Sequence, residues 1–311
     1  MRRQPPASQK VKSRKVKCLT GRDGGHMSPQ LTRNEGREGL PREVDAGGSG
    51  AERPPRKRPL SQRLGLALSG GGSRAAAFHR GIVQGLLEVP LPEVDVISTV
   101  SGGSIFGAAW MAARARAGAG ADRAKTDKDF LEMMGKELCK GFVARSLRPL
   151  ALLRLPLPRY TRTNVIAETF DRIFFQGLTL KELPEFPRLC INTTVLNHAQ
   201  VGKFSRDGFR TPGVNVDGEG LNRVAKLPDF SVALAAAASA AFPVGLPPLF
   251  LRRLDLGETT AFSRELEGHE TLALSDGGVL ENLGVQTLLA TTGTFGTCDL
   301  IISDAGAREH S

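Results

Sequence analysis

Three glycine-rich turns, each at the end of a short apolar run, constrain the fold of this chain more than any other feature. The segments read LGLALSGGGSR at residues 64–74, VDVISTVSGGS at 94–104 and TLALSDGGVLEN at 271–282. A short apolar run that stops at glycines is typical of a buried strand, and a helical pattern follows each of the first two turns. Two strand–turn–helix units in succession predict parallel strands joined by a crossover.

From residue 64 onward, short apolar runs keep alternating with longer helical patterns, which predicts an α/β domain over residues 64–311. Strands are expected at 64–68, 94–100, 189–195, 272–275 and 300–303. Helices are expected from the first glycines to about residue 88, from 102 to about 115, and at 129–140, with a surface loop at 117–127. The chain ends soon after the last predicted strand, so we leave open that a covering helix at the C-terminal end is missing.

The positive charge of the chain is concentrated in residues 1–63. These residues hold 16 of the 42 Lys and Arg residues and 6 of the 32 acidic residues, so they account for the whole formal charge of +10. Few aromatic residues and many Arg, Lys, Gly and Pro residues are typical of disorder. The tail is interpreted as a solvated leader, and the alternative is a contact with an anionic membrane or nucleic acid. No nucleic-acid partner is expected for the protein.

Targeting signals are few. No signal-peptide-like run follows the first arginines, and prolines and glycine break the longest uncharged stretch, residues 230–251. The four cysteines lack metal-ligand spacing and fit a reducing compartment, so a cytoplasmic protein without a metal or cofactor is expected. Residues 142–160 interleave leucines with arginines and prolines, which suits either a segment at a bilayer surface or a flap packed on the domain.

The first turn offers bare backbone N–H groups from Gly70, Gly71 and Gly72 at the start of a predicted helix. Such a turn can bind a phosphate or a developing oxyanion. The letters GGGSRA also satisfy the dinucleotide pattern G-x-G-x-x-A, although the acidic residue expected at the end of the next strand is absent. No Lys-Ser/Thr pair follows, which excludes the phosphate loop of kinases and ATPases.

The second turn resembles a nucleophile elbow, in which a serine occupies a strained bend between strand and helix. Ser101 is followed by Gly102 and Gly103, while Thr99 replaces the first glycine of the G-x-S-x-G pattern. Ser69 also ends a predicted strand and is the rival nucleophile, but three glycines after it suit donation of N–H groups better. Ser101 is therefore the preferred nucleophile.

The third turn supplies Asp276, followed by Gly277 and Gly278. The alternative interpretation is a turn aspartate that accepts local N–H groups, and Asp304 is a rival carboxylate in a similar setting. A histidine would be the usual base for a serine, but none of the five histidines follows a predicted strand. Together the turns supply donors for an oxyanion, a nucleophile and a base, which a covalent acyl hydrolase requires.

The segments SGGGSR, TVSGG and SDGGVLEN, with ASAAFPVGLPPL at 238–249, resemble the patatin-like phospholipases and, more distantly, the cytosolic phospholipase A2 group. The resemblance covers most of residues 64–306. It departs from the family at Thr99, at Ala75 where glycine often follows the arginine, and at Ser69 where plant members have aspartate. The resemblance implies a three-layer α/β/α sandwich with a mainly parallel central sheet.

The resemblance also implies a Ser-Asp dyad without histidine, in which Asp276 takes the proton of Ser101 and the loop at Gly70 to Gly72 holds the oxyanion. Arg74 would cap this loop or place an anionic head group, with a salt bridge at the helix start as the equal alternative. The expected activity is hydrolysis of fatty acyl esters of phospholipids or lysophospholipids, with peripheral membrane contact. A thioesterase or neutral-lipid esterase, a catalytically silent lipid-binding or scaffold module, and a nucleotide-binding protein remain as alternatives.

Overall fold

The computed structural model describes residues 59, 62–141, 161–214, 220–225, 227, 229–252, 271–289, 296–297 and 299–306. The predicted basic tail lies almost wholly outside these residues, as does the segment 142–160, so what the sequence predicts for both stays a prediction. The described residues belong to one compact unit. Among them, no helix is both long and apolar enough to cross a membrane.

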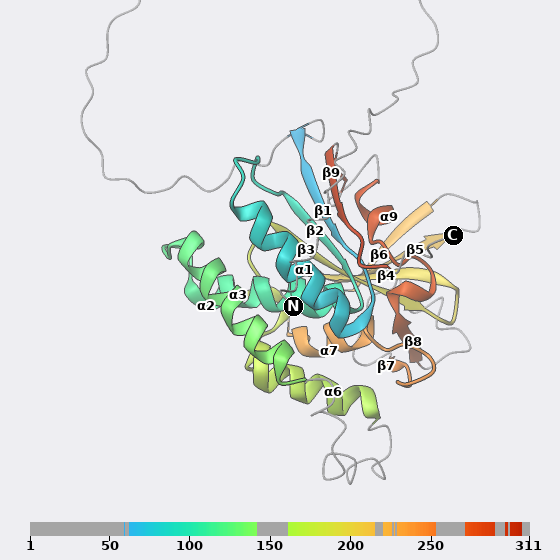
Figure 1. The fold of residues 1–311 in the computed structure, drawn as a ribbon. Helices are drawn as coiled ribbons and strands as arrows, with labels where there is room; N and C mark the ends of the chain where they lie inside the picture. The colour runs from blue at the N-terminus through green and yellow to red at the C-terminus, as the bar shows by residue number, and fades with distance from the viewer. Residues whose placement is uncertain are drawn as a thin grey trace, which may run out of the picture. The chain divides into compact units, whose positions relative to one another are not determined.

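Four of the five predicted strands form the parallel part of a mixed sheet (Figure 1). They run parallel in the spatial order β3, β2, β1, β9. Their bounds are β1 Leu64–Leu68, β2 Val96–Val100, β3 Arg188–Val195 and β9 Asp299–Ser303. Every residue of β1 and β2 is buried, as expected for continuous apolar runs covered on both faces.

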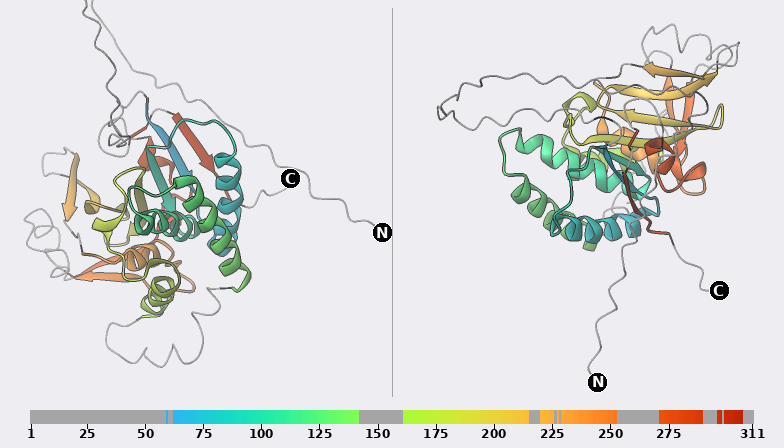
Figure 2. Two further views of the ribbon diagram at one scale, coloured as in Figure 1. Left: turned by 90° about the vertical axis from the view of Figure 1, so that its left-hand side faces the viewer. Right: turned by 90° about the horizontal axis from the view of Figure 1, so that it is seen from above.

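Antiparallel strands extend the sheet beyond β3 (Figure 2). They are β4 Gln200–Ser205, β5 Gly208–Val214 and β6 Gly220–Ala225, together with β7 Leu249–Arg252 and β8 Thr271–Asp276, and β8 pairs with both β7 and β3. The sequence predicted β8 but not β4 to β7, because glycines and charged residues interrupt their apolar pattern. The parallel centre of the sheet is confirmed, and these strands are added to it.

Helices cover both faces of the parallel strands, which confirms the three-layer α/β/α prediction. Successive side chains of a strand point to opposite faces, so Leu66 and Leu68 pack in the larger core while Ala67 packs with Leu288 on the other face. The helices of the larger face are α1 Gly72–Leu87, α2 Gly102–Ala117, α3 Arg123–Cys139, α6 Arg162–Phe170 with the π-helical turn Asp171–Phe175, and α7 Val232–Ser239. The opposite face has the short helix α9 Val285–Leu288.

Helix α3 begins six residues earlier than predicted, so the expected surface loop at 117–127 is wrong over its second half. The side chain of Asp122 accepts a hydrogen bond from the N–H of Lys125 at 3.2 Å and caps the new first turn. Aspartate is a favoured N-cap residue because it satisfies a backbone donor that has no partner within the helix. The charged residues that suggested a loop are therefore the first turn of α3.

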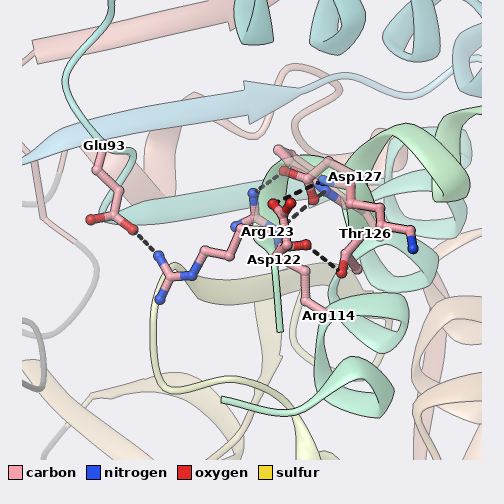
Figure 3. A network of polar contacts seen from close by, with 8 residues as sticks. Glu93, Arg114, Asp122, Arg123, Thr126 and Asp127 are labelled. Carbon is pink, nitrogen blue, oxygen red and sulfur yellow. Dashed lines mark hydrogen bonds and ion pairs between the residues drawn. The ribbon is translucent and has the colours of Figure 1, made fainter. Parts of the chain in front are cut away.

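Asp127, in the next turn of the helix, joins α3 to α2 through a buried ion pair (Figure 3). Arg114 donates two hydrogen bonds to the Asp127 carboxylate, at 2.8 and 2.6 Å, and Trp110 Nε1 donates a third at 2.7 Å. The guanidinium also lies 4.6 Å from the centre of the Trp110 ring. Asp127 is only 2% exposed, so little water reaches this carboxylate. If the carboxylate were removed, water could not readily take its place as the acceptor for the three N–H donors.

Replacing Asp127 by alanine is expected to lower the free energy of unfolding by about 3 kcal/mol, because the substitution leaves a largely buried guanidinium without its partner. Urea unfolding followed by circular dichroism measures the change. The matched control is Glu93→Ala, which removes the partner of Arg123 in a half-exposed ion pair and should cost less than about 1 kcal/mol. Equal losses in the two variants would contradict the expectation.

Candidate active site

The ends of β2 and β8 meet along one side of β3. Strand β2 runs parallel to β3 and pairs up to the Val100–Asn192 position, while β8 runs antiparallel and pairs from Thr193, opposite Asp276. The two strands therefore approach each other head to head, each with its C-terminal end at the meeting point. This arrangement brings the residue after β2, Ser101, next to the last residue of β8.

Ser101 occupies the strained bend that the sequence predicted. Its backbone has φ 50° and ψ −118°, in a region that costs a non-glycine residue on the order of 1–3 kcal/mol. Helix α2 starts immediately afterwards and packs closely on the first glycine turn. A Cβ atom on Gly102 would lie 2.0 Å from the carbonyl oxygen of Gly72, and one on Gly103 would lie 2.3 Å from that of Leu68. Both glycines therefore permit the approach that holds the bend.

Ser101 and Asp276 are in direct contact. The hydroxyl of Ser101 donates to Asp276 Oδ2 at 2.7 Å, and the N–H of Gly278 donates to Oδ1 at 2.7 Å. Burial raises the pKa of the Asp276 carboxyl above its ordinary value, against the lowering effect of these two hydrogen bonds. Gly277 lets the turn approach β3, since a Cβ there would lie 2.7 Å from the carbonyl oxygen of Asn192. The arrangement can move a proton from the hydroxyl to the carboxylate.

The glycine turn differs from the prediction at one residue. The N–H of Gly70 donates to the carbonyl oxygen of Asn282 at 2.9 Å, so it is not free to hold an oxyanion, and the expectation for Gly70 is corrected. Gly71 and Gly72 adopt φ values of 133° and 63°, which favour glycine, and they line the pocket at Ser101. Their N–H groups donate no hydrogen bond to the described residues.

A chain of hydroxyl groups beneath the bend explains how threonine replaces the first glycine of the elbow pattern. Thr99 Oγ1 donates to the carbonyl oxygen of Cys190 and accepts from Ser104, whose oxygen lies 2.8 Å from Ser239 Oγ. The methyl group of Thr99 has room because α2 carries a glycine opposite it: a Cβ on Gly107 would lie 2.6 Å from Thr99 Cγ2.

Ser239 supports the backbone of the bend and was not predicted. Its Oγ accepts a hydrogen bond from the N–H of Ser101 at 3.0 Å and donates to the carbonyl oxygen of Asn192. The residue lies at the end of α7, within the segment ASAAFPVGLPPL that carried part of the family resemblance. That segment was the available signal, but nothing in its letters assigns Ser239 a contact with Ser101.

The rival residues of the sequence analysis lie elsewhere. Ser69 is fully buried, and its Oγ accepts from the N–H of Ala305 at 2.8 Å. Asp304 is exposed and accepts from the N–H of Gly306, as a turn aspartate does. Arg74 is exposed and forms no ion pair with the described residues. Within the described part of the chain, no cluster of three or more metal-ligating side chains is present.

His79 supports the glycine turn instead of serving Ser101. Its Nε2 lies 2.8 Å from the carbonyl oxygen of Ser69 and its Nδ1 lies 2.7 Å from Ser303 Oγ. A carbonyl oxygen only accepts, so Nε2 carries the proton and Nδ1 accepts from the serine hydroxyl. Burial lowers the pKa of His79 from 6.5 to about 4, so the ring is neutral at physiological pH.

The lowered pKa of His79 predicts that the protein loses stability in acid. Between the folded pKa near 4 and the unfolded value of 6.5, the unfolded chain binds more protons, so the free energy of unfolding falls as the pH falls. From pH 7 to pH 5 the contribution of His79 is about 2 kcal/mol. Urea unfolding at both pH values should show this loss in the wild type and a smaller one in His79→Gln. Equal pH dependence in the two proteins would contradict the assignment.

A pocket of about 590 Å³ opens beside Ser101 and Asp276. Its wall includes Gly71 and Gly72, Asn282 at the end of the third motif, and apolar side chains from α2, α6 and the turns after α7 and β8. The apolar residues are Ile105, Ile166, Phe170, Ala240, Phe242, Pro243, Leu246 and Val279. A largely apolar pocket with a few polar groups at one end suits a ligand with an apolar chain and one reactive polar group.

The family model described as patatin-like phospholipase matches residues 66–289. No curated protein matches the chain. Among solved structures, human GIVD cytosolic phospholipase A2 is 13% identical with a TM-score of 0.48, over 72% of this chain and 43% of that one. VipD from Legionella pneumophila is 16% identical with a TM-score of 0.30, over 72% of this chain and 47% of that one. The chain thus spans less than half the length of either protein.

Proposed function

Because this chain belongs to the patatin-like phospholipase family, we propose that it is a serine acyl hydrolase that cleaves fatty acyl esters of phospholipids or lysophospholipids. Membership of the family supports a lipid acyl hydrolase. The observation that carries the finer proposal is the 2.7 Å hydrogen bond from the Ser101 hydroxyl to the buried Asp276 carboxylate at the wall of an apolar pocket. Nucleophile and base within this distance form the geometry that acyl transfer requires.

In the first half-reaction, Ser101 Oγ attacks the ester carbonyl carbon while Asp276 Oδ2 takes the hydroxyl proton. The carbonyl oxygen carries the negative charge of the tetrahedral intermediate. When that intermediate collapses, the bond from carbon to the alkoxy oxygen breaks, and the proton passes from Asp276 to the departing alcohol. The acyl group is then bound to Ser101 as an ester, and Asp276 is again a carboxylate.

In the second half-reaction, Asp276 takes a proton from water, and the water oxygen attacks the acyl carbon. Collapse of this intermediate breaks the bond to Ser101 Oγ, which takes the proton back from Asp276. The fatty acid is released and both residues return to their starting states. The raised pKa of Asp276 supports both roles, because a carboxylate of greater basicity is a better proton acceptor near neutral pH.

The developing oxyanion would be held by the N–H groups of Gly71 and Gly72. They belong to the N-terminal end of α1, a helix of 16 residues whose dipole favours negative charge at this end. Donors of this kind act without rearrangement, because the backbone already holds them in place. Arg74, exposed in the first turn of the same helix, would meet an anionic head group outside the pocket.

The substrate class follows from the wall and rim of the pocket. The wall between Ile105, Ile166 and Phe170 offers an acyl chain a continuous apolar contact. Two of the lining residues, Phe242 and Val279, are 50% and 48% exposed, and their near neighbours Val244 and Leu280 are 96% and 43% exposed. Exposed apolar side chains next to an apolar pocket support peripheral contact with a membrane surface.

A fluorophosphonate with a fatty alkyl chain tests the proposal. The folded wild type should be labelled, and peptide mapping should place the label on Ser101, with no label in Ser101→Ala. A folded wild type that stays unlabelled would overturn the hydrolase proposal in favour of a lipid-binding module. Label on Ser69 would overturn only the site. Release of fatty acid from a phospholipid, a lysophospholipid, a thioester and a neutral lipid then separates the substrate classes.

A further inference from the structure

Asn282 lies at the junction of all three glycine turns. A Cβ atom on Gly70 would lie 2.1 Å from Asn282 Oδ1 and 3.2 Å from the Cβ of Ser101, so the side chains of Asn282 and Ser101 both lie next to Gly70. A Cβ on Gly278 would lie 2.7 Å from Asn282 Oδ1 and 3.1 Å from Asp276 Oδ1. The amide of Asn282 therefore lies close to both Ser101 and Asp276, and the exposed residue lines the pocket with them.

The backbone of Asn282 accounts for the loss of one expected oxyanion donor. Its carbonyl oxygen accepts the N–H of Gly70, which removes that group from the pocket. The side-chain Oδ1 faces Gly70 and Gly278, so the Nδ2 amide group is left for another acceptor. No described residue accepts a hydrogen bond from this group, and Asn282 lines the pocket at the reacting residues.

The loop holds Asn282 in place before any ligand arrives. Glu281 accepts the N–H groups of Leu283 and Gln286 through its two carboxylate oxygens, and its own N–H donates to the carbonyl oxygen of Gly277. These three hydrogen bonds all lie within the segment from Gly277 to the start of α9, so they hold its backbone in one conformation. These bonds hold the backbone that carries Asn282, so the amide starts close to the reacting residues, as a donor of an oxyanion hole must.

We propose that Asn282 is a third catalytic residue, whose Nδ2 group donates a hydrogen bond to the carbonyl oxygen of the substrate as it becomes negative. The inference rests on the proposed function of Ser101 and Asp276. It assigns the oxyanion hole to the N–H groups of Gly71 and Gly72 and the Asn282 amide, in place of three successive glycines.

The test compares wild type, Asn282→Ala, Asn282→Asp and Gln286→Ala. Gln286→Ala is the matched control, because it removes an exposed amide four residues further along that does not line the pocket. Hydrolysis of a soluble fatty acyl ester gives kcat and KM, and the second-order rate of fluorophosphonate labelling gives a readout that stops at the first covalent step. Melting temperatures check that each variant is folded.

We expect Asn282→Ala to lower kcat and the labelling rate by about 10²- to 10³-fold with little change in KM. Asn282→Asp keeps the shape but replaces the donor by a carboxylate, so its loss should be larger, and Gln286→Ala should match the wild type. Labelling of folded Asn282→Ala at the wild-type rate, or a change confined to KM, would overturn the assignment and leave the proposed function standing. A wild type that is not labelled would instead reject the proposed function itself.

Discussion

Ser101→Ala is expected to lower kcat for ester hydrolysis by at least about 10⁴-fold, because it removes the pocket hydroxyl that donates to the Asp276 carboxylate. The melting temperature should stay close to that of the wild type, since the only side-chain bond lost is the donation to Asp276. Removing this hydroxyl leaves the pocket wall unchanged, so a substrate analogue should still bind. Fatty acid release under single-turnover conditions measures the effect.

Ser205→Ala is the matched control for this variant. Ser205 is buried like Ser101, but its Oγ has no hydrogen-bond partner in the described part of the chain and it lies on β4, outside the pocket. Its activity should equal that of the wild type. Retention of more than about a tenth of the activity in Ser101→Ala would show that the reaction does not pass through this serine.

Asp276→Asn is expected to lower kcat/KM by about 10⁴-fold, because an amide cannot take the serine proton. In the wild type, kcat/KM should fall as the pH falls through the pKa of Asp276, which burial raises above the ordinary carboxyl range. The kcat/KM of Asp276→Asn should not show this fall at low pH, the acid limb of the profile. An Asp304→Asn control, in which an exposed turn carboxylate is changed, should retain both the rate and the limb.

Asp276→Asn should also stabilise the fold at neutral pH. A raised pKa means that folded Asp276 binds its proton more tightly than the unfolded chain does, so ionisation lowers the free energy of unfolding as the pH rises. Asp276→Asn should therefore melt at a higher temperature than the wild type at pH 7, and the difference should shrink toward pH 4. A less active variant that is also less stable at pH 7 would contradict this account of the carboxyl.

The local parts of the site could be predicted from the sequence because each is coded by neighbouring residues. An apolar run followed by a serine and two glycines specifies the bend at Ser101, and the structure places it between β2 and α2. The same reasoning placed Asp276 at the end of a strand. A turn of this sequence can follow a parallel or an antiparallel strand, however, so the direction of β8 in the sheet was not predictable.

The remaining features depend on contacts between distant segments. The hydrogen bond from Gly70 to Asn282 joins two turns that are each regular by themselves, so sequence reasoning assigned the Gly70 N–H to the pocket. Ser239 belongs to an alanine-rich helix and contacts Ser101 only after α7 has packed on β3. The early start of α3 is different, because Asp122 is a local N-cap signal that the charged composition of the segment obscured.

The head-to-head meeting of β2 and β8 has a consequence for the order in which activity appears during synthesis. The serine and its carboxylate are 175 positions apart in the chain, and β3, the strand that both β2 and β8 pair with, is made between them. The bend at Ser101 and its supports, Asn192 and Ser239, all precede β8 in the chain, so a nascent chain can complete the bend before β8 exists. Until β8 is added beside β3, Ser101 lacks the Asp276 carboxylate, and the pocket lacks the part of its wall that Asp276, Val279 and Asn282 form. Under the proposed mechanism, hydrolysis therefore begins only once β8 has joined the sheet.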